Sequence, residues 1–222
     1  MEIKPIAYIH TDFCEKFGIP RQSGRVPDLI GEIVFTPEFN NPEAIRGLEE
    51  FSHIWLIFGF SEAKYKEGTM TVRPPRLGGN TRVGVFASRS PYRPNSLGLS
   101  CVKIEKIEQG KIMVSGVDIL DKTPIYDIKP YIPYSDSIPD ALGSFAEEMK
   151  DHSLEVDFPQ ELLDIIPEEK QKAVINCLRD DPRPTYQEDE RNYSMAFSEY
   201  DIHFTVENKK LTVTSVDKKS NG

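Results

Sequence analysis

The sequence predicts a mainly β fold, in which an antiparallel barrel or sandwich is followed by a small α+β domain. Short apolar segments rich in β-branched and aromatic residues recur through residue 139 and alternate with Gly- and Pro-containing turns. This pattern is typical of all-β barrels and sandwiches. From residue 140 the apolar spacing becomes helical and acids predominate. We therefore expect a β domain over residues 1–139 and an acidic α+β domain over residues 140–222.

The net charge of −9 comes entirely from the C-terminal part of the chain. Residues 1–139 hold 17 acids and 17 bases, so the remaining residues hold 36 − 17 = 19 acids and 27 − 17 = 10 bases. An acidic protein binds nucleic acid poorly without a local basic patch, because non-specific affinity comes from neutralising phosphates. Any nucleic-acid site must therefore use the arginines between Arg73 and Arg93.

Composition also gives an expectation about the compartment. No apolar run approaches the roughly 18 residues that span a bilayer, and the start of the chain lacks the basic-then-apolar design of an export signal. The three cysteines are odd in number and widely spaced, which suits reduced thiols better than a disulfide framework. We expect a cytoplasmic protein without a membrane segment.

In the N-terminal part, apolar runs predict seven strands in succession. A Gly- and Pro-containing loop follows the first of them, over residues 16–28, and Asn41 with Pro42 after it marks a short helix start. Gln109-Gly110 predicts a hairpin turn between the last two strands. The expected strands are residues 3–11, 31–36, 52–60, 70–73, 83–88, 97–107 and 111–117.

Two further regions complete the chain. Residues 121–124 (DKTP) predict a turn, and the strand after it places Ile125, Asp127, Lys129 and Tyr131 on one face by the period of two. Helical spacing from Pro159 to Leu178 is interrupted by Pro167, which predicts two helices. A final hairpin is expected around Asn208, with strands over residues 200–206 and 211–216.

The most informative stretch is a stiff, basic loop. Residues 71–102 contain five arginines and no acid, and Pro91 and Pro94 restrict the loop that carries Arg89 and Arg93. Guanidinium groups pair with carboxylate or phosphate in a fixed bidentate geometry, so this loop suits a small anionic ligand. The alternative is a structural loop with solvated arginines.

Several common enzyme motifs are absent from the sequence. There is no GxGxxG after a strand, no GxxxxGK[ST], no GxSxG and no His or Cys spacing typical of a metal site. A dinucleotide-type methyltransferase fold, a P-loop nucleotidase and an iron–sulfur enzyme therefore have no support.

A family resemblance rests on long motifs in a fixed order. FSHIW, VRPPRLGG, VGVFASRSPYRPNSLGLS and LDKTPIYDIKPYIP, followed by DPRPTY, resemble the TsaA-like family. Its members include S-adenosylmethionine-dependent tRNA methyltransferases that N6-methylate threonylcarbamoyladenosine beside the anticodon. The resemblance covers residues 6–136 and resumes at residue 181. It implies an antiparallel β-barrel, a homodimer, S-adenosylmethionine as cofactor and modified tRNA as substrate.

The resemblance also assigns residues to the cofactor site. Lys122 stands where we expect glycine, so a turn with positive φ would be strained there, and Ser23 replaces an expected proline. The implied cofactor contacts are Gln22, Ser23, Gly24, Ser61, Glu62, Arg89, Leu99, Asp121, Lys122, Thr123 and Pro124.

Substrate contacts and a proton acceptor complete the hypothesis. We assign Arg76, Arg93 and Asn95 to the modified nucleotide and its carboxylate. Asp121, Asp127 and His53 are candidates for the proton acceptor, although a lone histidine beside a tryptophan in a strand is more often a core residue. Two alternatives remain open: a non-catalytic module that senses S-adenosylmethionine, and an interaction domain whose arginines pair with acids of a partner.

Overall fold

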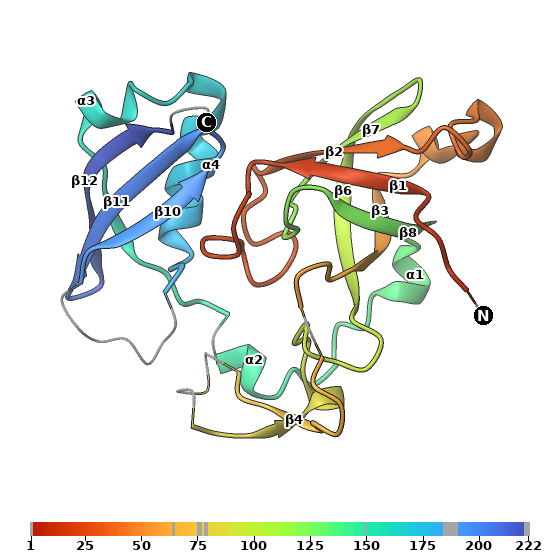
Figure 1. Ribbon diagram of the computed structural model, residues 1–222, viewed down its shortest axis with the longest axis horizontal. Coiled ribbons are helices and arrows are strands. Elements are labelled where there is room, and N and C mark those ends of the chain that lie inside the picture. The colour runs from red at the N-terminus through yellow and green to blue at the C-terminus, as the bar shows by residue number, and fades with distance from the viewer. Residues whose placement is uncertain are drawn as a thin grey trace.

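The computed structural model describes residues 2–63, 65–74, 77, 80–148, 150–183 and 191–219. Figure 1 shows two β units side by side, a closed barrel and a smaller C-terminal sheet with helices. Across these residues, no helix combines the length and apolar character needed to cross a bilayer.

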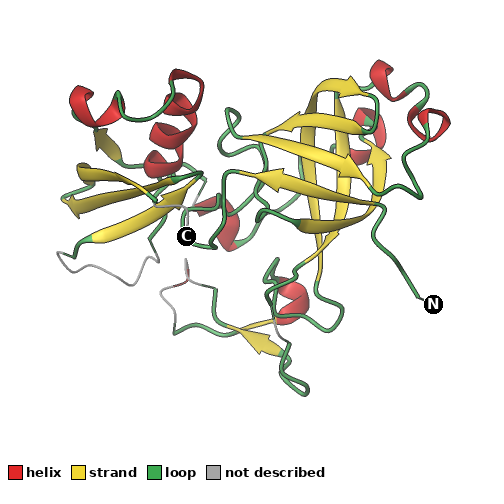
Figure 2. Ribbon diagram, turned by 45° about the horizontal axis from the view of Figure 1, so that its top comes forward, coloured by secondary structure: helices red, strands yellow, loops and turns green. Residues whose placement is uncertain are grey.

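The predicted antiparallel barrel or sandwich is a closed barrel of six strands with only antiparallel pairs (Figure 2). The order around it is β1-β2-β7-β6-β3-β8, and β8 pairs back to β1. The strands are β1 (Ala7–Thr11), β2 (Ile30–Phe35), β3 (His53–Gly59), β6 (Leu97–Glu108), β7 (Lys111–Ser115) and β8 (Thr123–Pro130).

Alternating side chains fill the barrel interior. In β1, Ala7 and Ile9 are fully buried while Tyr8 between them is exposed, which is the period-two pattern of a half-buried strand. The predicted hairpin between β6 and β7 is confirmed, with Gly110 at φ 79° in the turn. Other fully buried barrel residues are Ile33, Ile54, Leu56, Ile112, Val114 and Ile125.

Short elements decorate the barrel. The predicted cap at Asn41 is confirmed: its side chain accepts a hydrogen bond from the Glu43 amide at 3.0 Å, and the 3-10 turn η1 (Pro42–Ile45) follows. A second 3-10 turn, η2, covers Leu48–Glu50. The two-residue strands β4 (Thr71–Val72) and β5 (Val83–Gly84) pair in a small projection from the barrel (Figure 1).

The predicted buried strand over residues 83–88 is wrong. β5 ends at Gly84, and a 3-10 turn, η4 (Val85–Ala87), takes its place. Val85 is buried but Phe86 is 77% exposed. The apolar run contains one buried residue and one exposed aromatic residue. Hydrophobic periodicity cannot distinguish so short a run from a buried strand.

The predicted common face of β8 is wrong for Ile125. A register shift against β3 lies between the pairs Ile57↔Asp127 and Phe58↔Ile125, so β8 contains a bulge. Ile125 therefore points into the core, whereas Asp127 lies outside and pairs with Lys129 at 2.9 Å. An extra residue in one strand reverses the alternation beyond it.

After the barrel, α1 (Pro133–Asp136) and α2 (Phe145–Glu148) lead to a sheet in the order β10-β11-β12-β9, in which β9 is parallel to β12. The predicted division into two helices at Pro167 is confirmed, and Asn208 and Lys209 form the predicted final turn with positive φ. Strands β9 and β10 escaped prediction. The remaining elements are β9 (Glu155–Asp157), α3 (Gln160–Leu163), α4 (Glu168–Arg179), β10 (Tyr193–Phe197), β11 (Tyr200–Glu207) and β12 (Lys210–Lys218).

The segment between β1 and β2, residues 12–29 (the β1–β2 loop), packs against the C-terminal unit. Phe13 is fully buried and meets Phe197 edge-on at 5.5 Å, and Phe17 stacks on Tyr193 at 6.4 Å. Gly18 has φ 95° and leaves no room for a Cβ beside Met195. The loop is therefore part of a hydrophobic core shared by both units.

Candidate functional site

A pocket of about 800 Å³ opens at one end of the barrel. This is the end where β3 finishes and the antiparallel strand β6 begins. The β1–β2 loop, the arginine-bearing loop over residues 86–95 and the segment from Asp118 to Leu120 complete its walls. Three loops that are distant in sequence thus meet over one strand pair.

The wall formed by β3 and β6 is apolar and tightly packed. Phe58 and Phe60 lie edge to face at 5.1 Å, and Leu97, Leu99 and Ile119 add aliphatic surface. A Cβ at Gly98 would lie 2.3 Å from the Phe58 ring. Glycine at this position therefore lets the aromatic wall approach β6, and the surface suits a flat apolar or aromatic group.

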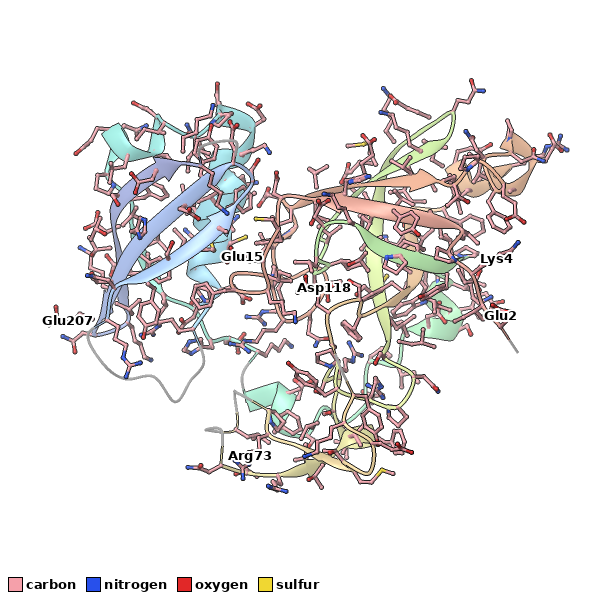
Figure 3. All side chains as sticks on the ribbon, viewed as in Figure 1. Glu2, Lys4, Glu15, Arg73, Asp118 and Glu207 are labelled. Atoms are coloured by element: carbon pink, nitrogen blue, oxygen red, sulfur yellow. The ribbon has the colours of Figure 1, made fainter. Side chains whose placement is uncertain are left out.

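Asp118 is the polar centre of this pocket. Figure 3 shows it near the middle of the molecule, where the barrel faces the β1–β2 loop. The buried Ser100 hydroxyl donates a hydrogen bond to its carboxylate at 2.6 Å, and the Ser23 amide donates another. Burial raises the pKa of Asp118 to about 6, although these donors and nearby Arg89 oppose the rise.

The rim carries cations in fixed positions. Arg89 donates to the Gln22 side chain, and Arg93 donates to the Ser88 carbonyl at 3.2 Å. Lys16 pairs with Glu62 at 3.4 Å. The contacts of Arg89 and Lys16 join different rim loops, and that of Arg93 braces its own loop, so the positive groups are arranged before a ligand arrives.

The structure brings most of the predicted contact residues together at this pocket. Ser23 and Gly24 lie just behind the wall: the Ser23 hydroxyl accepts from the Cys101 amide at 3.2 Å, and the Gly24 amide donates to the Gly116 carbonyl at 2.9 Å. Arg76 lies outside the described residues. The predicted residues that line the pocket are Gln22, Ser61, Glu62, Arg89, Arg93, Asn95, Leu99 and Thr123.

The turn at residues 121–124 adds only Thr123 to the described pocket lining. Asp121 instead accepts a hydrogen bond from the Thr11 amide at 3.2 Å and lies at the same distance from His10. Lys122 has φ 61°, so the positive-φ turn is present with a lysine where we expected glycine. A non-glycine residue costs about 1–2 kcal/mol in this conformation, which the hydrogen bond from its amide to the Ile9 carbonyl helps to offset.

None of the three predicted proton acceptors is among the described residues that line the pocket. His53 bonds with Ser52, Asp121 anchors the end of β1, and Asp127 pairs with Lys129. The sequence did not single out Asp118 as a pocket residue, because an aspartate just before the DKTP segment is typical of a turn. Its position as the first acid after a buried apolar strand was the available signal.

The described residues contain no group of three or more His, Cys, Asp or Glu side chains arranged to hold a metal ion. The polar groups that line the pocket include hydroxyls, amides, guanidinium groups, carboxylates and the Lys16 ammonium. This set suits hydrogen bonding and ion pairing with an organic ligand.

Comparisons with known proteins find the same family for the barrel and for the C-terminal unit. The family model described as the tRNA-methyltransferase O N-terminal domain matches residues 8–137, and that of the TrmO C-terminal domain matches residues 151–219. A tRNA (adenine(37)-N6)-methyltransferase of Escherichia coli is 34% identical, with 97% of each chain covered. The candidate S-adenosylmethionine-dependent methyltransferase RcsF of Pseudomonas aeruginosa is 40% identical, with 91% of each chain covered.

A solved structure shows the same arrangement. The crystal structure of TrmO from Pseudomonas aeruginosa superposes with a TM-score of 0.82 at 33% identity, covering 98% of this chain and 97% of that one. Family match, sequence identity and shape therefore extend over the barrel and the C-terminal sheet alike. The chain belongs to the tRNA-methyltransferase O family.

Proposed function

We propose that this protein is an S-adenosylmethionine-dependent tRNA methyltransferase that transfers a methyl group to N6 of threonylcarbamoyladenosine beside the anticodon. One observation carries the proposal: most of the predicted contact residues, from segments distant in sequence, line one pocket at the barrel end. The full-length similarity to a named tRNA (adenine(37)-N6)-methyltransferase supports the reaction class.

The residues that line the pocket fit S-adenosylmethionine. The pocket volume lies in the usual range of about 300–1,000 Å³ for small-ligand sites. The aromatic and aliphatic wall suits the adenine ring, Arg89 and Gln22 suit a carboxylate, and the carboxylates suit an ammonium group. When bound, the cofactor supplies an activated methyl group on a cationic sulfur. The protein's main task is then to hold the acceptor nitrogen in line with it.

Arg93 and Asn95 are proposed to hold the modified nucleotide. Both lie in the loop that borders the pocket, and Arg93 is already oriented by the Ser88 carbonyl. The threonylcarbamoyl group carries a carboxylate, which a guanidinium can pair with. Because the chain is net acidic, recognition is expected to depend on this local contact more than on general attraction to the tRNA backbone.

We further propose that the protein is a cytoplasmic homodimer. Phe86, Tyr92 and Leu99 line the pocket and are 77%, 50% and 55% exposed. A partner subunit seated there would cover this apolar rim and enclose the cofactor. Light scattering at micromolar concentration should give twice the mass of 25.3 kDa.

We also propose residues 1–139 as the cofactor-binding domain and residues 140–222 as the C-terminal domain.

A catalytic role is favoured over a non-catalytic sensor of S-adenosylmethionine, because the named relatives are methyltransferases. The decisive test has two stages. Calorimetry with EDTA present should show saturable binding of S-adenosylmethionine. Labelled methyl groups should then pass to tRNA carrying threonylcarbamoyladenosine, and mass spectrometry should locate them at N6. Cofactor binding without any transfer would favour the sensor.

A further inference from the structure

We propose that Asp118 is the catalytic proton acceptor of the methyl transfer. This inference rests on the proposed function and adds the one chemical group that the sequence left unassigned. The acceptor nitrogen lies between a purine and a carbamoyl group, so its lone pair is delocalised and it carries a proton that must leave. A carboxylate facing the pocket can take that proton.

Position favours Asp118 over the other acid at the pocket. Among the described lining residues, the carboxylates are Glu62 and Asp118. The Glu62 side chain is 58% exposed and pairs with Lys16 at the rim. Asp118 instead lies deeper, with Ser100 and Ser23 donating to it from two different elements. These donors fix its orientation and leave it further acceptor capacity for a substrate N–H.

The charged groups around Asp118 keep it usable as a base at neutral pH. Arg89 approaches from the arginine-bearing loop, while Lys16 and Arg21 line the pocket from the β1–β2 loop, and Arg93 and Glu62 complete the rim. Burial raises the pKa of Asp118 to about 6. At pH 7.5 the carboxylate is therefore ionised but more basic than an exposed aspartate, which is the condition that favours proton transfer.

The step balances as follows. The bond between N6 and the methyl carbon forms while the sulfonium S–CH₃ bond breaks, and its electron pair stays on sulfur, giving a neutral sulfide. The N6 proton passes to the Asp118 carboxylate. The resulting carboxylic acid later releases this proton to water, and no oxidant or reductant is required.

Asp118→Asn tests the assignment, with Asp127→Asn as the matched control outside the pocket. With modified tRNA and saturating S-adenosylmethionine, kcat of Asp118→Asn should fall by about 10²–10⁴-fold, the usual contribution of a general base. The affinity for S-adenosylhomocysteine, which lacks the sulfonium charge, should stay within about threefold of wild type. If kcat stays within threefold, Asp118 is not the base. If S-adenosylhomocysteine binding is lost by a folded variant, Asp118 is a binding residue instead.

Ser100→Ala supplies a second test, the pH dependence of activity, which would not change if Asp118 had a purely structural role. The Ser100 hydroxyl stabilises the ionised carboxylate, so its removal should raise the pKa of Asp118. The acidic limb of the kcat/KM profile for tRNA should then shift to higher pH, and NMR of labelled aspartate should show the same displacement. An unmoved limb would overturn the proposal. If the wild type binds cofactor but transfers no methyl group, the proposed function fails by itself, whatever these variants show.

Discussion

Arg25 in the β1–β2 loop is paired with Asp180 at the end of α4, with Arg25 Nε lying 2.5 Å from a carboxylate oxygen. The same guanidinium reaches the carbonyls of Lys150 and His152 at 3.2 and 3.4 Å. Its loop also carries Gln22, which contacts Arg89 at the pocket. The C-terminal unit thus helps to hold a wall of the proposed cofactor site.

Replacing Arg25 with alanine should destabilise the protein by about 3 kcal/mol, because it removes a buried ion pair with Asp180 and the hydrogen bonds of Arg25 to two backbone carbonyls. The exposed fractions of the two side chains are 23% and 9%. Urea unfolding measures the change. Lys172→Ala is the control: Lys172 pairs with Asp28 but is 77% exposed, so its loss should cost less than about 1 kcal/mol. Equal losses would contradict a tightly held loop.

Gly98→Ala should distort the pocket wall. The new Cβ would meet the Phe58 ring at 2.3 Å, and overpacking of this kind costs about 1–3 kcal/mol. Both stability and affinity for S-adenosylmethionine should fall, as measured by thermal unfolding and calorimetry. Gly84→Ala is the comparison, since beyond its chain neighbours no atom of the described residues lies within 4 Å of its Cβ position. A Gly98→Ala protein with wild-type affinity would show that this wall is not used.

Arg89→Ala should lose at least about tenfold in cofactor affinity, the cost of one charge-assisted hydrogen bond of about 1.5–3 kcal/mol. Arg46→Ala should bind normally, because Arg46 is 72% exposed and pairs only with Glu43 on η1 among its described ion pairs. Calorimetry compares the two variants. If they bind equally well, the arginine-bearing loop is not part of the cofactor site.

Asp118→Asn should stabilise the folded protein at pH 7.5 and leave it nearly unchanged at pH 4. The folded-state pKa is about 6 against 3.8 for the ordinary side chain, so the native state holds this proton more tightly than the unfolded state. Stability therefore decreases as pH rises from about 4 to 6, by at most about 3 kcal/mol. Urea unfolding at the two pH values measures the difference. A variant less stable than wild type at pH 7.5 would indicate that Asp118 is structural.

Arg93→Ala should reduce methyl transfer to tRNA carrying threonylcarbamoyladenosine by about tenfold or more, while leaving the cofactor affinity within a few-fold of wild type. A site built to pair a charged group rejects substrates that lack it, since its own polar groups are left unpaired. The wild type should therefore ignore unmodified transcript. Comparable labelling of modified and unmodified tRNA would show that the carboxylate is not recognised.

Local sequence signals predicted several turns, caps and breaks in both units. The cap at Asn41, the turn at Gly110 and the division at Pro167 each depend on residues close in sequence, and each is confirmed. The errors have tertiary causes. The bulge in β8 depends on its pairing with β3. Residues 83–88 would form a buried strand only if Phe86 packed into the core, but Phe86 is exposed.

The pocket was predicted only in part, because some of its features are local in the sequence and others arise from contacts between distant segments. Arg89 and Arg93 stand out in a loop with prolines, so their function was suggested by residue type. The sequence shows Asp118 only as an acid after an apolar strand, and its chemical environment forms when Ser100 of β6 and Ser23 of the β1–β2 loop meet around it. Its raised pKa is a property of burial, which no local pattern encodes.

The packing of the β1–β2 loop has a consequence for how the protein matures during synthesis. Phe13 leaves the ribosome well before Phe197, which packs against it, and Arg25 leaves well before Asp180, with which it pairs. The loop that bears Gln22 therefore lacks its support until the C-terminal unit has been synthesised. A nascent chain that ends before this unit would hold a barrel whose pocket wall is not anchored, so we expect competence to bind the cofactor only after the C-terminal unit has been synthesised and has packed on the loop.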